Sequence, residues 1–161
     1  MTMGRAGTAS ALPDLASPDL HHRLTAGMGA VRRLLDVLRA EMGDAQVSAE
    51  MNDTSQIIMA EVLNNVVEHA YGFAHGQPME VSIWLQPDGI LCEVRDEGVP
   101  MPWGRVPAGV MPVVDQDRPA TLPEGGFGWA LVRDLTQDIQ YWREQDQNRL
   151  RFFIPAEVEA D

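Results

Sequence analysis

The 161-residue chain contains no lysine, and its 12 arginines face 24 acidic residues, which gives a formal net charge of −12 at pH 7. Nucleic-acid binders need a clustered basic surface, because neutralising phosphates releases counterions. The arginines here are scattered, so we expect no direct nucleic-acid partner. The negative charge suits solubility, and it equally suits a basic protein partner; charge alone does not separate these two explanations.

Cysteine and long apolar runs are also scarce. The single cysteine, Cys92, excludes an intramolecular disulfide, and its place in an alternating apolar run predicts a small buried side chain. No uninterrupted apolar stretch reaches the roughly 18 residues that span a bilayer. The first residues lack the basic region and apolar core of a secretory signal. These absences predict a cytoplasmic protein without membrane association.

Length and composition predict one domain. A chain of 161 residues with 45% hydrophobic content is long enough for one compact domain and too short for two ordinary ones. We expect residues 1–18, which are small, polar and proline-containing, to be disordered. Residues 19–155 are expected to form the domain, and residues 156–161 an acidic tail.

Hydrophobic periodicity predicts the order of the elements. We expect a short edge strand at 19–25 and three helices, at 26–42, from Ser48 to about Ala70 and at 127–136. We also expect two hairpins. The first pairs 80–86 with 90–95, and the second pairs 139–143 with 149–154 around a turn at 144–148. Because the helices are grouped and the strands are joined by short turns, this order favours an α+β fold. We expect a two-layer α/β sandwich with a mostly antiparallel mixed sheet and helices on one face; a parallel doubly wound fold is disfavoured.

A long segment without periodicity, residues 99–124, holds six of the eleven prolines. Loops of this length inside compact domains are usually lids, binding loops or disordered segments. Because the segment lies between two glycine-containing motifs, we interpret it as a lid over a bound ligand. A passive surface insertion is the alternative.

A carboxylate and a carboxamide lie one helical turn apart in the first motif, EVLNNVVEHAY at residues 61–71. Glu61, Asn65 and either Glu68 or His69 share a helix face. An asparagine oxygen can complete a Mg²⁺ shell otherwise filled by phosphate oxygens and water, and a carboxylate can orient or deprotonate an attacking hydroxyl. A solvated helix face is the alternative, and His69 is more typical of a structural histidine than of a general base.

The second motif, VRDEGVP at residues 94–100, places an acid on a glycine turn. The Asp96 carboxylate can accept a hydrogen bond from an exocyclic amine, and Gly98 can let a base approach the backbone. On its own the motif is more often a simple turn than a site.

The third motif, GGFGWALV at residues 125–132, is a glycine-rich entry into a helix. Helix amino termini present N–H groups that can cradle a phosphate, although short glycine runs also serve as flexible linkage. Together, the three motifs predict one nucleotide site, and ATP is the leading ligand.

The three motifs, in this order and spacing, resemble the N, G1 and G2 boxes of the GHKL (Bergerat-fold) ATPases, and among these the anti-sigma factor serine/threonine kinases. The resemblance spans roughly residues 26–154. It rests on three patterns: Glu61-x-x-x-Asn65-x-x-x-His69-Ala70-Tyr71, Asp96-x-Gly98-x-Pro100, and Gly125-Gly126-x-Gly128 followed by Leu131-Val132-Arg133 and a closing Asn148-Arg149-Leu150 hairpin.

This resemblance implies the Bergerat fold and a kinase that uses Mg-ATP to phosphorylate a serine or threonine of an anti-sigma antagonist protein, and that otherwise binds and silences a sigma factor. A homodimer is also implied. The implied site residues are Glu61 as catalytic base, Asn65 as Mg²⁺ ligand, Asp96 as adenine reader, and His69, Gly98, Pro100, Gly125, Gly126, Phe127 and Gly128 as further ATP-binding positions.

Some residues depart from the pattern of that family. Trp129 replaces the usual leucine, and Met101 and Trp103 stand where an aromatic-acid-proline run is common, which concerns the packing of the lid. Without lysine, Arg105 or Arg118 would have to meet the γ-phosphate, a contact to which arginine is chemically suited.

Two other functional classes compete with the kinase. One is a non-catalytic module in which ATP, or no ligand, tunes a protein interface within a partner-switching pathway. The other is the detached ATPase half of a histidine kinase. The second is disfavoured, because His21-His22 is not followed by a helical phosphoacceptor motif with its downstream proline, and the chain is too short for a dimerisation hairpin ahead of the domain.

Overall fold

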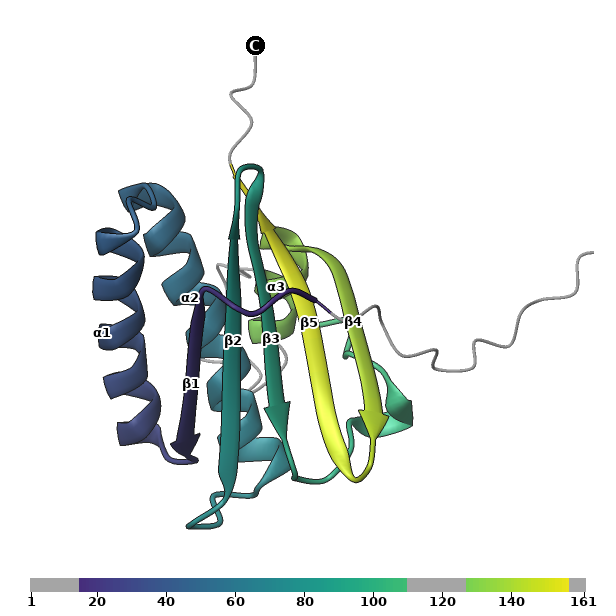
Figure 1. The fold of residues 1–161 in the computed structure, drawn as a ribbon. Coiled ribbons are helices and arrows are strands. Elements are labelled where there is room, and N and C mark those ends of the chain that lie inside the picture. The colour runs from purple at the N-terminus through teal and green to yellow at the C-terminus, as the bar shows by residue number, and fades with distance from the viewer. Residues whose placement is uncertain (1–14, 110–126, 157–161) are drawn as a thin grey trace, which may run out of the picture.

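The structure, a computed structural model, describes residues 15–109 and 127–156. The predictions for residues 1–14, for most of the proposed lid and for the end of the acidic tail lie outside this part. Within it, a five-stranded antiparallel sheet has the strand order β1-β2-β3-β5-β4 (Figure 1). The strands are β1 (Leu20–Thr25), β2 (Pro78–Gln86), β3 (Gly89–Asp96), β4 (Gln137–Glu144) and β5 (Gln147–Pro155). The predicted edge strand and both predicted hairpins are therefore confirmed.

The helices cover one face of this sheet, which confirms the predicted two-layer sandwich (Figure 1). They are α1 (Met28–Asp44), α2 (Ala49–Asn65) and α3 (Phe127–Leu135). Ser48 caps α2 as expected, because its hydroxyl accepts a hydrogen bond from the Met51 N–H at 3.1 Å. None of the described helices is long and apolar enough to cross a membrane.

Alternate residues of the central strands form the sheet side of the core. They are fully or almost fully buried and include Met79, Val81, Ile83, Ile90, Cys92, Val94, Leu150, Phe152 and Ile154. The burial of Cys92 is thus confirmed, and burial raises the pKa of its thiol strongly. No helix of the described residues lies on the opposite face of the sheet (Figure 1). Residues 15–18 cross this face in front of β2 and β3, and the Trp84 indole donates to the Ala16 carbonyl at 2.6 Å.

The last turn of the second predicted helix is wider than expected. Residues 66–70 form a π-helical turn, η1 (Val66–Ala70), in which the Tyr71 N–H donates to the Val66 carbonyl at 3.0 Å. A π turn opens the backbone by one residue and occurs frequently at functional sites. The α-helical register predicted through Ala70 therefore ends at Asn65.

The final hairpin turn is shorter than predicted. Strands β4 and β5 are joined by Gln145 and Asp146 alone, whereas a five-residue turn at 144–148 was expected. Both residues have left-handed φ angles, 52° and 61°. A two-residue hairpin turn of type I′ has this conformation at both central positions, and glycine or asparagine normally signals it. Because neither residue is present here, Asn148 was assigned to the turn and not to the strand.

Candidate functional site

The first and second motifs meet at one pocket on the helical side of the sheet. The pocket has a volume of about 420 Å³ and lies between α2, η1, the end of β3, the residues that follow it, and α3. This volume is within the range of small-molecule sites. Its lining residues are Val62, Asn65, Val66, His69, Ala70, Val94, Asp96, Val99, Pro100, Met101, Pro102, Pro107, Trp129, Tyr141, Asn148 and Leu150.

Asp96 is the buried acid of this pocket. It is 7% exposed at the end of β3, and its Oδ1 accepts hydrogen bonds from the Gly98 N–H at 2.9 Å and the Asn148 amide at 2.8 Å. Burial raises the pKa of the Asp96 carboxyl, while these two hydrogen bonds and the nearby Arg143 charge oppose the rise. The pocket therefore holds a desolvated carboxylate, a group that benefits from an additional hydrogen-bond donor.

Position 98 needs a residue without a side chain, because its backbone packs closely against the first motif. A Cβ at this position would overlap the backbone carbonyl of Ala70, and the adjacent Val99 N–H donates to that same carbonyl at 2.9 Å. The Tyr71 hydroxyl adds a second link, because it accepts from the Glu97 N–H at 2.6 Å. The sequence suggested a glycine that admits a base; the contact in the structure is with η1.

Glu61 and Asn65 lie one turn apart on α2, as predicted. The Asn65 amide nitrogen donates to the Glu61 carbonyl at 2.8 Å, and this bond orients the amide. Glu61 is half-buried and is not part of the pocket lining. Its carboxylate lies against Gly128, where a Cβ would overlap it. The third motif therefore contacts the first at the predicted catalytic acid.

The remaining predicted site residues have different outcomes. His69 and Pro100 line the pocket, although the His69 side chain is 66% exposed and lies 3.9 Å from the Glu68 carboxylate. Gly125 and Gly126 lie outside the described residues, as does the side chain of Phe127, whose backbone begins α3. Their predicted contacts with phosphate stay predictions.

The residues that depart from the family pattern fall into two groups. Trp129 and Met101 line the pocket, and Trp129 is 7% exposed within the core. Trp103 points away into solvent, 89% exposed and with a left-handed φ of 56°. Arg105 is exposed and does not line the pocket, and Arg118 lies outside the described residues.

Two functional candidates, Asn148 and Tyr141, are absent from the predicted site residues, although Asn148 belongs to the closing hairpin pattern of the family resemblance. Both line the pocket, and Asn148 is 4% exposed and bonded to Asp96. The signal available was the alternation of the last strand, in which residues 148, 150, 152 and 154 share one face. It was obscured because Asn148 was placed in a turn.

The described side chains at the site supply few ligands for a metal ion. Within residues 15–109 and 127–156, no group of three His, Cys, Asp or Glu side chains could hold one. Magnesium often takes one or two protein ligands and completes its shell with substrate phosphates and water. Among residues 15–109 and 127–156 the Asn65 amide oxygen has no hydrogen-bond partner, which fits that mode, so the residues present suit a nucleotide-borne Mg²⁺.

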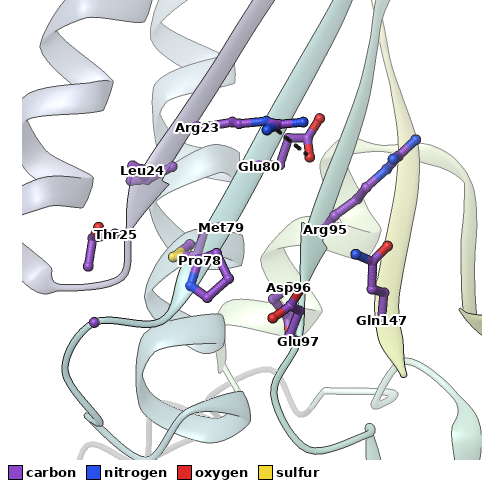
Figure 2. A pocket seen from close by; sticks show the side chains of 11 residues that line it. Arg23, Leu24, Thr25, Pro78, Met79, Glu80, Arg95, Asp96, Glu97 and Gln147 are labelled. Carbon is purple, nitrogen blue, oxygen red and sulfur yellow. Dashed lines mark ion pairs between the residues drawn. The ribbon is translucent and has the colours of Figure 1, made fainter. Parts of the chain in front are cut away.

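A second hollow lies on the helix-free side of the sheet. Figure 2 shows this space of about 510 Å³, where Arg23 pairs with Glu80 at 3.8 Å and where Arg95 and Gln147 also form part of the lining. Of the predicted site residues, only Asp96 takes part in its lining. The motifs therefore converge on the pocket between the helices and the sheet and not on this hollow.

Comparison with known proteins agrees with this geometry. Residues 24–154 match the family described as "Histidine kinase-like ATPase domain". The serine-protein kinase RsbW of Bacillus mycoides (strain KBAB4) is 29% identical over 109 residues, which cover 66% of this chain and 67% of the relative. The protein of the same name from Oceanobacillus iheyensis is 24% identical over 113 residues, or 70% of each chain.

Proposed function

This chain belongs to the histidine kinase-like ATPase domain family, and we propose that it is an anti-sigma regulatory kinase. In this proposal it binds Mg-ATP and phosphorylates a serine or threonine of an anti-sigma antagonist protein. When it is not bound to the antagonist, it sequesters a sigma factor. The names of the similar kinases support this activity, and the partners follow from the family resemblance.

One observation carries the proposal: motifs from three distant parts of the chain meet around Asp96, Asn65 and Glu61. Asp96 is desolvated at the end of the pocket and can accept a hydrogen bond from the amino group of adenine. Asn65 lines the same pocket. Gly128 of the third motif touches Glu61. In this proposal, the base and ion contacts lie in the pocket, and the phosphate contacts lie beside it, where Glu61 meets Gly128.

The residues have the following roles in this proposal. Asp96 binds the adenine ring, and Asn65 supplies an amide oxygen to Mg²⁺, which would neutralise charge on the phosphates. Glu61 accepts the proton of the attacking serine or threonine hydroxyl. The hydroxyl oxygen bonds to the γ-phosphorus, and the bond from that phosphorus to the ADP oxygen breaks. The position of Glu61 beside Gly128 places the proposed base next to the predicted phosphate loop.

Phosphoryl transfer tests the proposal directly. The purified chain is mixed with γ-labelled Mg-ATP and with single-domain candidate antagonists encoded in the same genome. We expect label on a serine or threonine of one antagonist, and we expect Glu61→Gln to abolish transfer while it spares nucleotide binding. A chain that binds ATP but labels none of the candidates would favour the non-catalytic regulatory module.

A further inference from the structure

Asp96, Asn148 and Arg143 form one row across three neighbouring strands. In the sheet register, Asn148 of β5 lies opposite Asp96 of β3 and opposite Arg143 of β4. Residues directly opposite in an antiparallel pair project to the same face. The row lies at the edge of the hydrophobic core, next to the pocket. Asn148, at the centre of the row, is 4% exposed.

The Asn148 carboxamide is held by donors on one side and by acceptors on the other. Its nitrogen donates to Asp96 Oδ1 at 2.8 Å, to the Val99 carbonyl at 2.9 Å and to the Gly98 carbonyl at 3.2 Å. Its oxygen accepts from the Tyr141 hydroxyl at 2.6 Å and from Arg143 at 2.9 Å. A flipped amide would place nitrogen against two donors and oxygen against three acceptors, so the orientation is fixed.

This fixed amide determines how Asp96 faces the pocket. Asp96 Oδ1 already accepts from Asn148 and from the Gly98 N–H. Among the described residues, Oδ2 has no hydrogen-bond partner, so Oδ2 is the oxygen left for a ligand. An ionised oxygen accepts the amino group of adenine and repels the O6 acceptor of guanine.

The same residue also anchors the backbone that follows Asp96 along the pocket. Asn148 binds the carbonyls of Gly98 and Val99, and Tyr141 accepts a hydrogen bond from the Met101 N–H at 3.0 Å. Val99 and Met101 both line the pocket. One hydrogen-bonded unit therefore links the acid to the part of the pocket lining at residues 98–101.

We propose that Asn148, held by Tyr141, is the positioning residue that makes this pocket select adenine. The inference rests on the proposed ATP binding and specifies how that site chooses its base. Asn148 acts through Asp96 and the 98–101 backbone, and Tyr141 acts through Asn148 and Met101. Neither residue needs to touch the phosphates.

Base discrimination is the measurement that tests this role. The dissociation constants of ADP and GDP are measured by calorimetry with Mg²⁺ for the native chain, Asn148→Ala and Tyr141→Phe. We expect Asn148→Ala to weaken ADP about 10- to 100-fold, as expected for loss of a hydrogen bond to a charged group, and to weaken GDP much less. Tyr141→Phe, which removes only a hydroxyl, should reduce the ADP preference in the same direction. Gln147→Ala, on the neighbouring position of β5 that faces the open side, is the matched control.

The pH profile of ADP binding separates positioning from general destabilisation. Loss of the Asn148 donor removes a hydrogen bond that lowers the pKa of Asp96, so the acid loss of ADP affinity should move to higher pH in Asn148→Ala. The charged or titratable groups nearest this carboxyl are Arg143, Glu97 and Tyr71, and His69 lines the same pocket. These groups are present in both chains, and of them Arg143 also loses its hydrogen bond to Asn148 in the variant.

Opposite results would overturn the inference in identifiable ways. Equal weakening of ADP and GDP, or an unchanged ratio and pH profile in both variants, would show that Asn148 and Tyr141 have no selective role. A native chain that binds neither nucleotide would overturn this inference together with ATP binding. A native chain that prefers ADP but transfers no phosphate would refute the proposed kinase alone.

Discussion

Gly128 of α3 lies directly against the carboxylate of Glu61 on α2, so closely that a single added carbon at Gly128 would overlap it. The two residues are 67 positions apart in the chain. Their contact joins the proposed catalytic acid to the glycine motif, and it turns an ordinary glycine-to-alanine change into a test of the site.

Gly128→Ala should displace Glu61 and impair the proposed phosphoryl transfer by at least about tenfold, because small misplacements of a reacting group are costly. Transfer to the antagonist and ADP affinity are the measurements. Gly43→Ala in α1 is the control, since a Cβ there meets nothing within 4 Å. Equal activity in the two variants would contradict the contact between α3 and Glu61.

Gly98→Ala should destabilise the fold by about 1–3 kcal/mol, the usual cost of forcing atoms into a packed site. The added carbon overlaps the Ala70 carbonyl, and both the Val99 hydrogen bond and η1 would have to move. Urea unfolding with and without ADP would measure the loss. Wild-type stability in this variant would mean that the 98–99 backbone does not pack on η1.

Asp96→Asn should leave the chain at least as stable as the native protein at pH 7 while it weakens ADP about 10- to 100-fold. Burial raises the pKa of Asp96 in the folded state, so the ionised form costs folding free energy above that pKa. The cost disappears as pH falls and the carboxyl is protonated in both states. The stability difference between variant and native chain should therefore shrink on acidification from pH 7 toward pH 3. A variant clearly less stable at pH 7 would contradict this sign.

Glu93→Gln should cost about 2 kcal/mol or more, because it leaves two arginines without their anion. Glu93 is 2% exposed, and its carboxylate accepts from Arg151 at 2.7 Å and from Arg95 at 2.8 Å. Although burial acts to raise the pKa of Glu93, these hydrogen bonds and charges outweigh burial and lower it.

The pH dependence of the Glu93 contribution has the opposite sign to that of Asp96. A lowered pKa gives stability that is complete above the unfolded value of about 4.3 and is lost as pH falls through the folded one. Acid unfolding curves should show this loss in the native chain and not in Glu93→Gln. Glu144→Gln is the control, since its carboxylate is 45% exposed and 4.0 Å from Arg149. A native curve that matches the Glu93→Gln curve would contradict the role of the pair.

The fold could be predicted because its signals are local. Apolar residues recur every three or four positions in α1 and alternate in the two strands on either side of residues 87–88. Both patterns show that one face of the element is buried, and they do not depend on which element covers that face. The π turn at 66–70 could not be predicted in this way. Its sequence is compatible with an α-helix, and its geometry accompanies a contact between Ala70 and Val99 that only the folded chain provides.

Pocket residues could be predicted where one short motif contains both the chemical group and its spacing, as for Asn65 and Asp96. Asn148 was not, because its importance depends on the pairing of β3 with β5, 52 positions apart. The hairpin turn that would have placed it uses Gln145 and Asp146 in a conformation that neither residue type signals. Tertiary register, and not residue type, makes this asparagine part of the site.

The strand β5 is last in the described chain, yet it lies between β3 and β4 in the sheet. On a ribosome, residues 61–100 therefore emerge well before the partner that orients their buried acid. The nascent chain has both helices α1 and α2 and the first hairpin, but its pocket lacks one wall until β5 inserts. A ligand that binds this pocket can therefore stabilise only a chain in which β5 has paired with β3.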